Sequence, residues 1–158
     1  VIVSAASESG MPEDEFQRMD NIVKIVDMCI NNGLNLEEIF IDPLIFPVSV
    51  NSVYPSHIFK TIKLIRNEYG EKIHITGGIS NVSFGIPKRK LINHVFLSLC
   101  IDQGLDSGII DPISTSIESA IKINKKDHSV ALALDLLNGN DEFAMNYISN
   151  FRSGKLQF

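Results

Sequence analysis

Residues 77–85 read GGISNVSFG and lie between a short β-branched run and a basic, then apolar, helical pattern. Two glycines at the end of a buried strand let the backbone turn sharply or approach a ligand closely. The Ser and Asn side chains that follow offer hydrogen-bond donors and acceptors. This stretch therefore predicts a strand end that holds a planar, polar molecule.

The strand before these glycines belongs to a unit that recurs along the chain. A strand-like run followed by an amphipathic segment of helical length occurs four times, with the runs at residues 1–6, 39–44, 73–79 and 108–111. Strands that alternate with helices pair in parallel through right-handed crossovers. The sequence therefore predicts an α/β fold.

The helices between these strands are expected to stop at Gly33, Gly70 and Gly104. The second and third cover residues 55–69 and 88–103. The first follows Pro12 and carries apolar residues at spacings of three and four, namely Phe16, Met19, Ile22, Val23, Val26, Cys29 and Ile30. Beyond Asp111 the pattern is helical only, with a capping box at residues 115–118, a helix at 129–137 and a last helix ending near Arg152. We expect one domain over residues 1–158.

Four consecutive strand-helix units fit two architectures, an open doubly wound sheet and half of an eight-stranded βα barrel. Polar residues occur at the carboxyl end of each strand: Ser4 and Ser7, Asp42, the GGISN stretch, and Asp111. Ligands bind at that end in both architectures. The pattern predicts a site there without choosing between the two folds.

Composition excludes several classes of function. The formal net charge of −5 argues against a general nucleic-acid surface, and the sequence has no apolar run of the about 20 residues that a membrane span needs. We expect a cytoplasmic protein. Cys29 and Cys100 are interpreted as buried, reduced thiols.

Two further features have ordinary explanations. The four histidines, His57, His74, His94 and His128, lie on separate elements and are interpreted as surface or packing residues, not metal ligands. The basic cluster Lys88-Arg89-Lys90 lies near a helix start, the less favourable end for cations. A solvated face is the favoured interpretation of this cluster, and a bound anion is the alternative.

The strand-end polar residues have two readings each. Asp42 ends an apolar run before Pro43, where it either caps a turn or binds a ligand. Ser80 and Asn81 are either turn residues or ligand-binding residues. For Asp111, which also precedes a proline, a loop cap is favoured.

Three stretches, residues 39–51, 77–85 and 91–112, together resemble the pterin-binding methyltransferases, which use methyltetrahydrofolate and a corrinoid. The motif SNVS at residues 80–83, after a Gly-rich strand end, is the specific feature. The family includes methyltetrahydrofolate:corrinoid/iron-sulfur protein methyltransferases and the folate domain of cobalamin-dependent methionine synthase. Residues 8–21 extend the resemblance to nearly the whole chain.

The resemblance implies a TIM-type (β/α)8 barrel, of which these residues form the last four βα units plus C-terminal helices. It also implies that the first four units lie outside this sequence. A half barrel leaves two unpaired strand edges. We therefore expect either a longer polypeptide or pairing with a second copy, and a homodimer is the default for such relatives.

The resemblance also implies a reaction. It is the transfer of a methyl group from 5-methyltetrahydrofolate, or a related methylpterin, to the cob(I)alamin of a corrinoid protein, with no metal bound by this chain. Asn81 matches the catalytic Asn near nitrogen 5 of the pterin, and Asp42 matches the Asp that binds the polar edge of the ring. Gly77, Gly78, Ser80 and Phe84 are implied to complete the substrate site.

Two alternatives stay open. A dihydropteroate synthase binds a pterin on the same barrel but needs basic residues beside the polar loop to take pyrophosphate, whereas the basic cluster here comes several residues after SNVS. The other alternative is a non-catalytic fragment that binds folate or a corrinoid protein. Folate and a methanopterin analogue are the two alternatives for the methyl donor.

Overall fold

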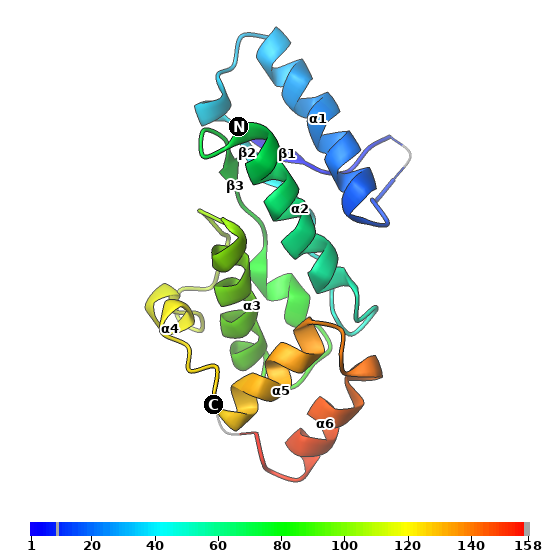
Figure 1. Ribbon diagram of the computed structural model, residues 1–158, viewed down its shortest axis with the longest axis vertical. Coiled ribbons are helices and arrows are strands. Elements are labelled where there is room, and N and C mark those ends of the chain that lie inside the picture. Colours follow the sequence, from blue (N-terminus) through cyan, green and yellow to red (C-terminus); the bar gives the residue numbers. More distant parts are fainter. Residues whose placement is uncertain (9, 157–158) are drawn as a thin grey trace.

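The computed structural model describes residues 1–8 and 10–156 (Figure 1). Three short strands form one parallel sheet in the order β1-β2-β3: Ile2–Ser4, Phe40–Asp42 and His74–Ile75. The crossovers contain α1, Glu15–Asn31, and α2, Tyr54–Tyr69. The chain is thus an α/β protein with a small parallel sheet, as the alternation of strands and helices predicted.

The strands are shorter than the predicted runs. The run at 108–111 forms no named strand and contributes one parallel bridge, between Gly78 and Ile109. Gly77 and Ile79 nevertheless bond to Ile109 through the backbone, with Ile109 N 2.9 Å from Gly77 O and Ile79 N 3.2 Å from Ile109 O. The fourth unit therefore lies beside the third, in the predicted parallel direction.

The two faces of the sheet differ in burial. Val3, Ile41 and Ile75 are neighbours in register and are buried. Alternate positions point to the opposite face, where Ile2 is 63% exposed and the rings of Phe40 and His74 stack with centroids 4.5 Å apart. Parallel sheets are usually covered on both faces, whereas this face of the sheet is half-open.

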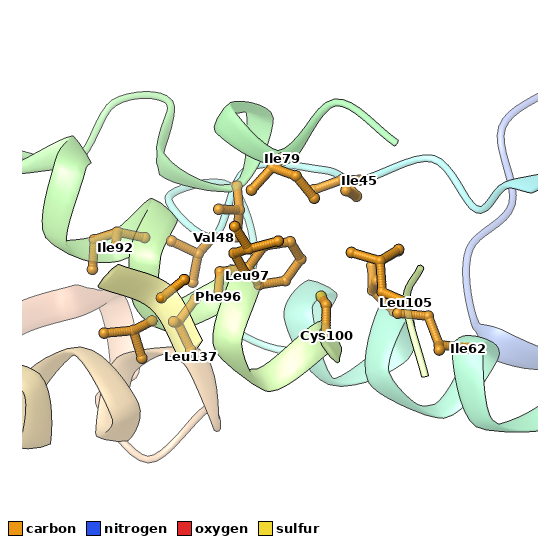
Figure 2. Packing of buried hydrophobic residues seen from close by; sticks show 14 of the residues in the cluster. Ile45, Val48, Ile62, Ile79, Ile92, Phe96, Leu97, Cys100, Leu105 and Leu137 are labelled. Atoms are coloured by element: carbon orange, nitrogen blue, oxygen red, sulfur yellow. The ribbon is translucent and has the colours of Figure 1, made fainter. Parts of the chain in front are cut away.

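Helix α3, Arg89–Gln103, forms the centre of the core. Figure 2 shows its side chains Phe96, Leu97 and Cys100 among residues from the loop after β2, from α2 and from α5. The glycines expected to end α2 and α3 do so, since Gly70 and Gly104 have φ values of 66° and 108°. Such a left-handed backbone favours glycine.

Three helices follow α3: α4, Ile117–Ile121; α5, His128–Leu137; and α6, Met145–Arg152. In Figure 1 α5 and α6 lie at the end of the molecule opposite to the sheet. Two single-turn 3-10 helices are η1, Leu36–Glu38, and η3, Glu142–Ala144. The capping box predicted at residues 115–118 is wrong, because the N-cap of α4 is Ser116, which accepts a hydrogen bond from Ser119 N at 3.2 Å, and position 119 is Ser instead of Glu or Gln.

The predicted apolar face of α1 is wrong in part. Phe16 is 65% exposed, and Cys29 is only partly buried, unlike the fully buried Cys100. The buried positions of α1 are Glu15, Arg18, Ile22 and Val26. No helix among the described residues is long and apolar enough to cross a membrane.

Candidate functional site

Asp42 is the last residue of β2 and lies half-buried at the carboxyl end of the sheet. Its Oδ1 accepts a hydrogen bond from Leu44 N at 2.9 Å, so Asp42 caps the turn that contains Pro43. Burial raises the pKa of this carboxyl above its ordinary value, and the Leu44 N–H bond opposes that rise. The turn-capping reading of Asp42 is therefore correct, and it occupies one carboxylate oxygen only.

Two glycines after β3 lie beside the side chains of Asp42 and Asn81. A Cβ placed on Gly77 would lie 3.0 Å from Ile45 Cδ1 and 3.4 Å from Asp42 Oδ1. A Cβ placed on Gly78 would lie 3.0 Å from Asn81 Nδ2. Asp42 and Asn81, which are 39 positions apart in the chain, are thus each packed against one of two consecutive glycines.

Asn81 lies in η2, the 3-10 helix Ile79–Ser83 that follows the glycines. Its backbone is held at both sides, since Asn81 N donates to Gly78 O at 3.1 Å and Phe84 N donates to Asn81 O at 3.2 Å. Its side chain is exposed and makes no hydrogen bond with the described residues. A fixed backbone with an open amide is suited to contact a ligand, because an amide can both donate and accept.

Arg89, the first residue of α3, fixes the shape of η2. Its Nη2 donates to Ser80 O at 2.8 Å, and its Nε donates to Ser83 Oγ at 3.0 Å. Ser83 Oγ in turn donates to Ser80 O at 3.1 Å. Residues 88–90 are exposed, as the interpretation of a solvated face predicted, but Arg89 also holds the turn that presents Asn81.

The remaining predicted residues lie on the same turn. The carbonyl of Ser80 is used by Arg89 and Ser83, and its half-exposed side chain lies next to Asn81 in sequence. The ring of Phe84 is 65% exposed and lies under the Arg89 guanidinium, 5.9 Å from its centroid. The backbone of Phe84 is tied to the loop after β2, because Ser49 Oγ donates to Phe84 O at 2.6 Å.

Asp111 caps its loop, as predicted, and His74 pairs with another aspartate. Asp111 caps its loop through Ile113 N at 3.0 Å and Ser114 Oγ at 2.8 Å, and the Ser114 bond is the main reason that its pKa is lowered. His74 Nδ1 lies 2.7 Å from Asp106 Oδ2 at the opposite end of the sheet from Asp42. The described residues contain no group of three or more His, Cys, Asp and Glu side chains that could hold a metal ion.

Three contributors to this site escaped prediction: Arg89, Ser83 and Leu44. Ser83 belongs to the motif SNVS, but its partner Arg89 follows six residues later in a cluster that composition alone assigns to solvent. Leu44 has a φ of 62°, an uncommon value for a non-glycine residue. Nothing in its residue type signals that conformation. The Asp-Pro pair before it signals a turn only.

Residues 3–111 match the family of pterin binding enzymes. The chain is 31% identical over 156 residues to a methylcorrinoid:tetrahydrofolate methyltransferase from Eubacterium limosum, covering 99% of this chain and 54% of that protein. It is 28% identical over 140 residues to a methionine synthase from Mycobacterium tuberculosis, covering 85% of this chain and 12% of that protein.

A methionine synthase from Mycobacterium leprae is 28% identical over 116 residues, or 70% of this chain and 10% of that protein. The chain therefore spans about half the length of the Eubacterium relative and about a tenth of the two synthases. The family match covers more than half of the chain and contains Asp42, Gly77, Gly78 and Asn81. This chain belongs to the pterin binding enzymes, as its sequence motifs predicted.

Proposed function

We propose that the strand ends carrying Asp42 and Asn81 bind the pterin ring of a folate. The further proposal is that the site takes part in methyl transfer between tetrahydrofolate and the corrinoid of a partner protein. The observation that carries the proposal is the packing of both side chains against the consecutive glycines Gly77 and Gly78. The names of the relatives support the reaction class.

Asp42 would bind the edge of the pterin that carries the ring N–H and the exocyclic amino group. These are two adjacent donors, and an ionised carboxylate accepts from such donors strongly. Oδ1 already accepts from Leu44 N, which leaves Oδ2 and the remaining lone pairs of Oδ1 for the ligand. Glycine at 77 keeps the backbone beside this carboxylate free of a side chain.

Asn81 would act at nitrogen 5 of the pterin. When a methyl group leaves nitrogen 5 as a cation equivalent, both bonding electrons stay on nitrogen, so a proton on nitrogen 5 makes departure easier. An amide can accept from the protonated nitrogen and donate to the neutral one, and it follows the change in charge without being an acid. The partner's corrinoid would supply the cobalt chemistry, and this chain would supply binding and orientation.

The direction of transfer is a property of the reactants and not of the site. The sequence resemblance implied transfer from methyltetrahydrofolate to the corrinoid, whereas the name of the Eubacterium protein puts the methylcorrinoid first. A site that stabilises one transition state accelerates both directions equally. The proposed roles of Asp42 and Asn81 are the same in either direction.

Dihydropteroate synthase chemistry is less well supported. Pyrophosphate binding next to the SNVS motif would need a basic side chain with open donors. Arg89, the residue of the basic cluster that reaches this motif, already donates from Nε and Nη2 to Ser83 and Ser80. Two of its five N–H donors therefore hold the turn, and the names of the relatives support methyl transfer instead.

We also propose that residues 1–158 are one pterin-binding-type domain and half of a (β/α)8 barrel. The open sheet face with exposed Ile2 supports this proposal. At the other edge an apolar cavity of about 200 Å³ lies between α3 and the 105–110 segment and is lined partly by Ile117, which is 54% exposed. Further βα units, from a longer polypeptide or a second copy, would cover the exposed Ile2 of β1 and the cavity beside residues 105–110.

The first test is calorimetric titration of the chain with 5-methyltetrahydrofolate. Asp42→Ala should weaken binding by about 10- to 100-fold, the range for a hydrogen bond to a charged group. Asp111→Ala is the matched control, because Asp111 also precedes a proline and caps a turn two residues on. Equal losses in both variants, or no loss in Asp42→Ala, would contradict the proposed site.

The second test separates catalysis from binding. The chain is mixed with tetrahydrofolate and methylcobalamin, and the cobalamin spectrum is followed with time. Asn81→Ala should slow transfer by about 100-fold, as for loss of one transition-state hydrogen bond. Tight folate binding without any transfer by the unmodified chain would favour the non-catalytic alternative.

A further inference from the structure

Arg18 is a fully buried cation in a helix that touches the candidate site. It lies on α1, and its side chain is 0% exposed. A buried charge is costly unless it is bonded. The positions of its hydrogen-bond acceptors therefore indicate what the charge is for.

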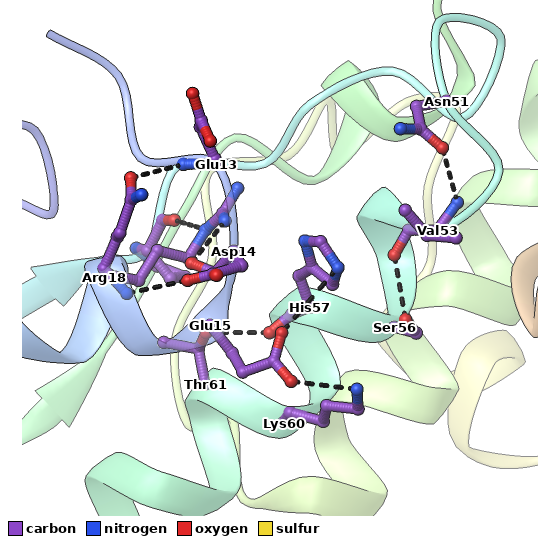
Figure 3. A network of polar contacts seen from close by, with 12 residues as sticks. Glu13, Asp14, Glu15, Arg18, Asn51, Val53, Ser56, His57, Lys60 and Thr61 are labelled. Carbon is purple, nitrogen blue, oxygen red and sulfur yellow. Dashed lines mark hydrogen bonds and ion pairs between the residues drawn. The ribbon is translucent and has the colours of Figure 1, made fainter.

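Most of the Arg18 guanidinium is directed at the loop that follows β2. Nε donates to Pro43 O at 2.9 Å, and Nη2 approaches Leu44 O at 3.4 Å. Its carbon lies 5.0 Å from the ring centroid of Phe46, within the range of a cation–π contact. The last bond, from Nη1 to Asp14 O at 2.9 Å, goes to the N-cap residue of α1 (Figure 3).

The carboxylates near Arg18 have other partners. Asp14 Oδ1 accepts from Gln17 N at 2.8 Å as the N-cap of α1. Glu15 pairs with Lys60 Nζ at 2.9 Å and lies 3.7 Å from His57 Nε2 (Figure 3). Among the described residues, Arg18 forms no salt bridge, and its bonds go to backbone carbonyls.

One peptide group joins Arg18 to Asp42. The C=O of Pro43 accepts from Arg18 Nε, and the N–H of the same peptide, which belongs to Leu44, donates to Asp42 Oδ1. Hydrogen bonds in such a chain polarise one another and become stronger. A positive charge at the carbonyl end thus makes the N–H a better donor to the carboxylate.

We infer that Arg18 is a positioning residue for Asp42, acting through the Pro43–Leu44 peptide to hold Oδ1 and to keep the carboxylate ionised for a ligand. The inference rests on the proposed function of Asp42. Arg18 also secures the uncommon backbone of Leu44, whose φ is 62°, from both flanking carbonyls. A turn with that backbone is retained only where its surroundings fix it.

Few other ionisable groups surround Asp42 and Arg18, so the effect of Arg18 on the pKa of Asp42 can be measured separately. Burial and the Leu44 N–H are the two influences on the pKa of Asp42, and the titratable groups facing Arg18 are Asp14 and Glu15 of α1 and Tyr54 of α2. Loss of Arg18 should weaken the Leu44 N–H bond. The Asp42 carboxyl should then titrate at a higher pH than in the unmodified chain.

The test uses Arg18→Met, Arg18→Lys and the control Arg66→Met in the whole chain. Arg66 also binds backbone carbonyls, those of Gly104, Gly70 and Ile73, but at the opposite end of the sheet. The titration midpoint of the Asp42 carboxyl is measured by carbon-13 NMR without ligand. The affinity for 5-methyltetrahydrofolate is measured by calorimetry from pH 5 to 8.

Arg18→Met should raise the Asp42 midpoint and weaken binding about tenfold at neutral pH, with a larger loss at lower pH. Arg18→Lys should raise the midpoint and weaken binding less than Arg18→Met does, because it keeps a buried cation. Arg66→Met should leave the midpoint unchanged. An unchanged midpoint in a folded Arg18→Lys or Arg18→Met chain, or an equal shift in Arg66→Met, would overturn the inference.

The two proposals fail in different ways. If the unmodified chain binds no folate while the Asp42 midpoint still depends on Arg18, the positioning role stands and the proposed ligand is wrong. If folate binding needs Asp42 but neither the midpoint nor the affinity depends on Arg18, the site stands and the positioning role is wrong. If Arg18→Met does not fold, the Lys variant decides the outcome.

Discussion

The side-chain amide of Asn81 lies over Gly78, so closely that a Cβ at position 78 would stand 3.0 Å from Asn81 Nδ2. The close contact comes from the neighbouring side chain, and the backbone itself does not need a glycine, because Gly78 has a φ of −75°. The absence of a side chain at position 78 therefore leaves room for the amide of Asn81. This relationship gives the first prediction.

Gly78→Ala should displace the Asn81 side chain and leave the fold intact, since a surface amide can rotate away. Affinity for 5-methyltetrahydrofolate should fall about five- to tenfold, the effect of one neutral hydrogen bond. Calorimetry and thermal unfolding measure the two effects. Gly77→Ala is the contrast, because its Cβ would meet the core residue Ile45 at 3.0 Å and should lower the melting temperature as well.

Asp42→Asn should bind folate at least tenfold more weakly and yet be more stable at neutral pH. Because the pKa of Asp42 is raised in the folded chain, the folded state holds its proton to higher pH than the unfolded state. The stability contribution of Asp42 is therefore complete below its unfolded pKa and is lost as pH rises through the folded pKa. The neutral amide avoids that loss.

The free energy of unfolding of the Asp42→Asn chain and of the unmodified chain, measured at pH 3 and pH 7, checks the direction of this pH dependence. The gain in stability of Asp42→Asn over the unmodified chain should be larger at pH 7 and should nearly vanish at pH 3. A gain that is equal at both values would mean that burial of the charge is not its cause.

Arg89→Met should loosen the turn Ile79–Ser83 that presents Asn81. It removes bonds to Ser80 O and Ser83 Oγ. Because Arg89 is exposed, we expect a stability loss of only about 1 kcal/mol together with weaker folate binding. Amide hydrogen exchange of residues 80–84 should become faster. Lys90→Met, one position on, is the control and should change neither quantity.

Asp106→Ala should affect stability without affecting the site. Asp106 Oδ1 accepts from Ile75 N at 2.7 Å and lies 3.3 Å from Arg66 Nη2, at the end of β3 away from Asp42. Loss of these charge-assisted bonds should cost about 2 kcal/mol. Chemical denaturation measures the cost. Folate affinity of the folded variant, taken by calorimetry, should match that of the unmodified chain, and a large drop would show that the two ends of the sheet are coupled.

Several features of this protein could be predicted from the sequence because they depend on local chemistry. Gly70 and Gly104 end their helices in left-handed backbone, where residue type decides the conformation. The alternation of strands with helices predicted parallel pairing, and β1, β2 and β3 pair in that way. The family followed from the stretches around Asp42 and SNVS, and its match covers residues 3–111.

The strand ends were only partly predictable. The sequence indicated that Asp42 and Asn81 end or follow neighbouring strands, but either residue could have been an ordinary turn residue. Asp42 does cap a turn and still has acceptor capacity, whereas Asp111 uses both oxygens in its own loop. Identical Asp-Pro pairs thus have different surroundings, which local sequence does not specify.

Only the tertiary structure decided what Arg18 and Arg89 do. In the folded helix Arg18 shares the buried face of Glu15, Ile22 and Val26, although its charge argued for solvent and the predicted apolar face did not include it. The carbonyl of Pro43, 25 residues later, settles the conflict by compensating the buried charge. Spacing along a chain shows which residues share a helix face. The hydrogen-bond acceptors that compensate a buried charge come from segments that meet only in the folded protein.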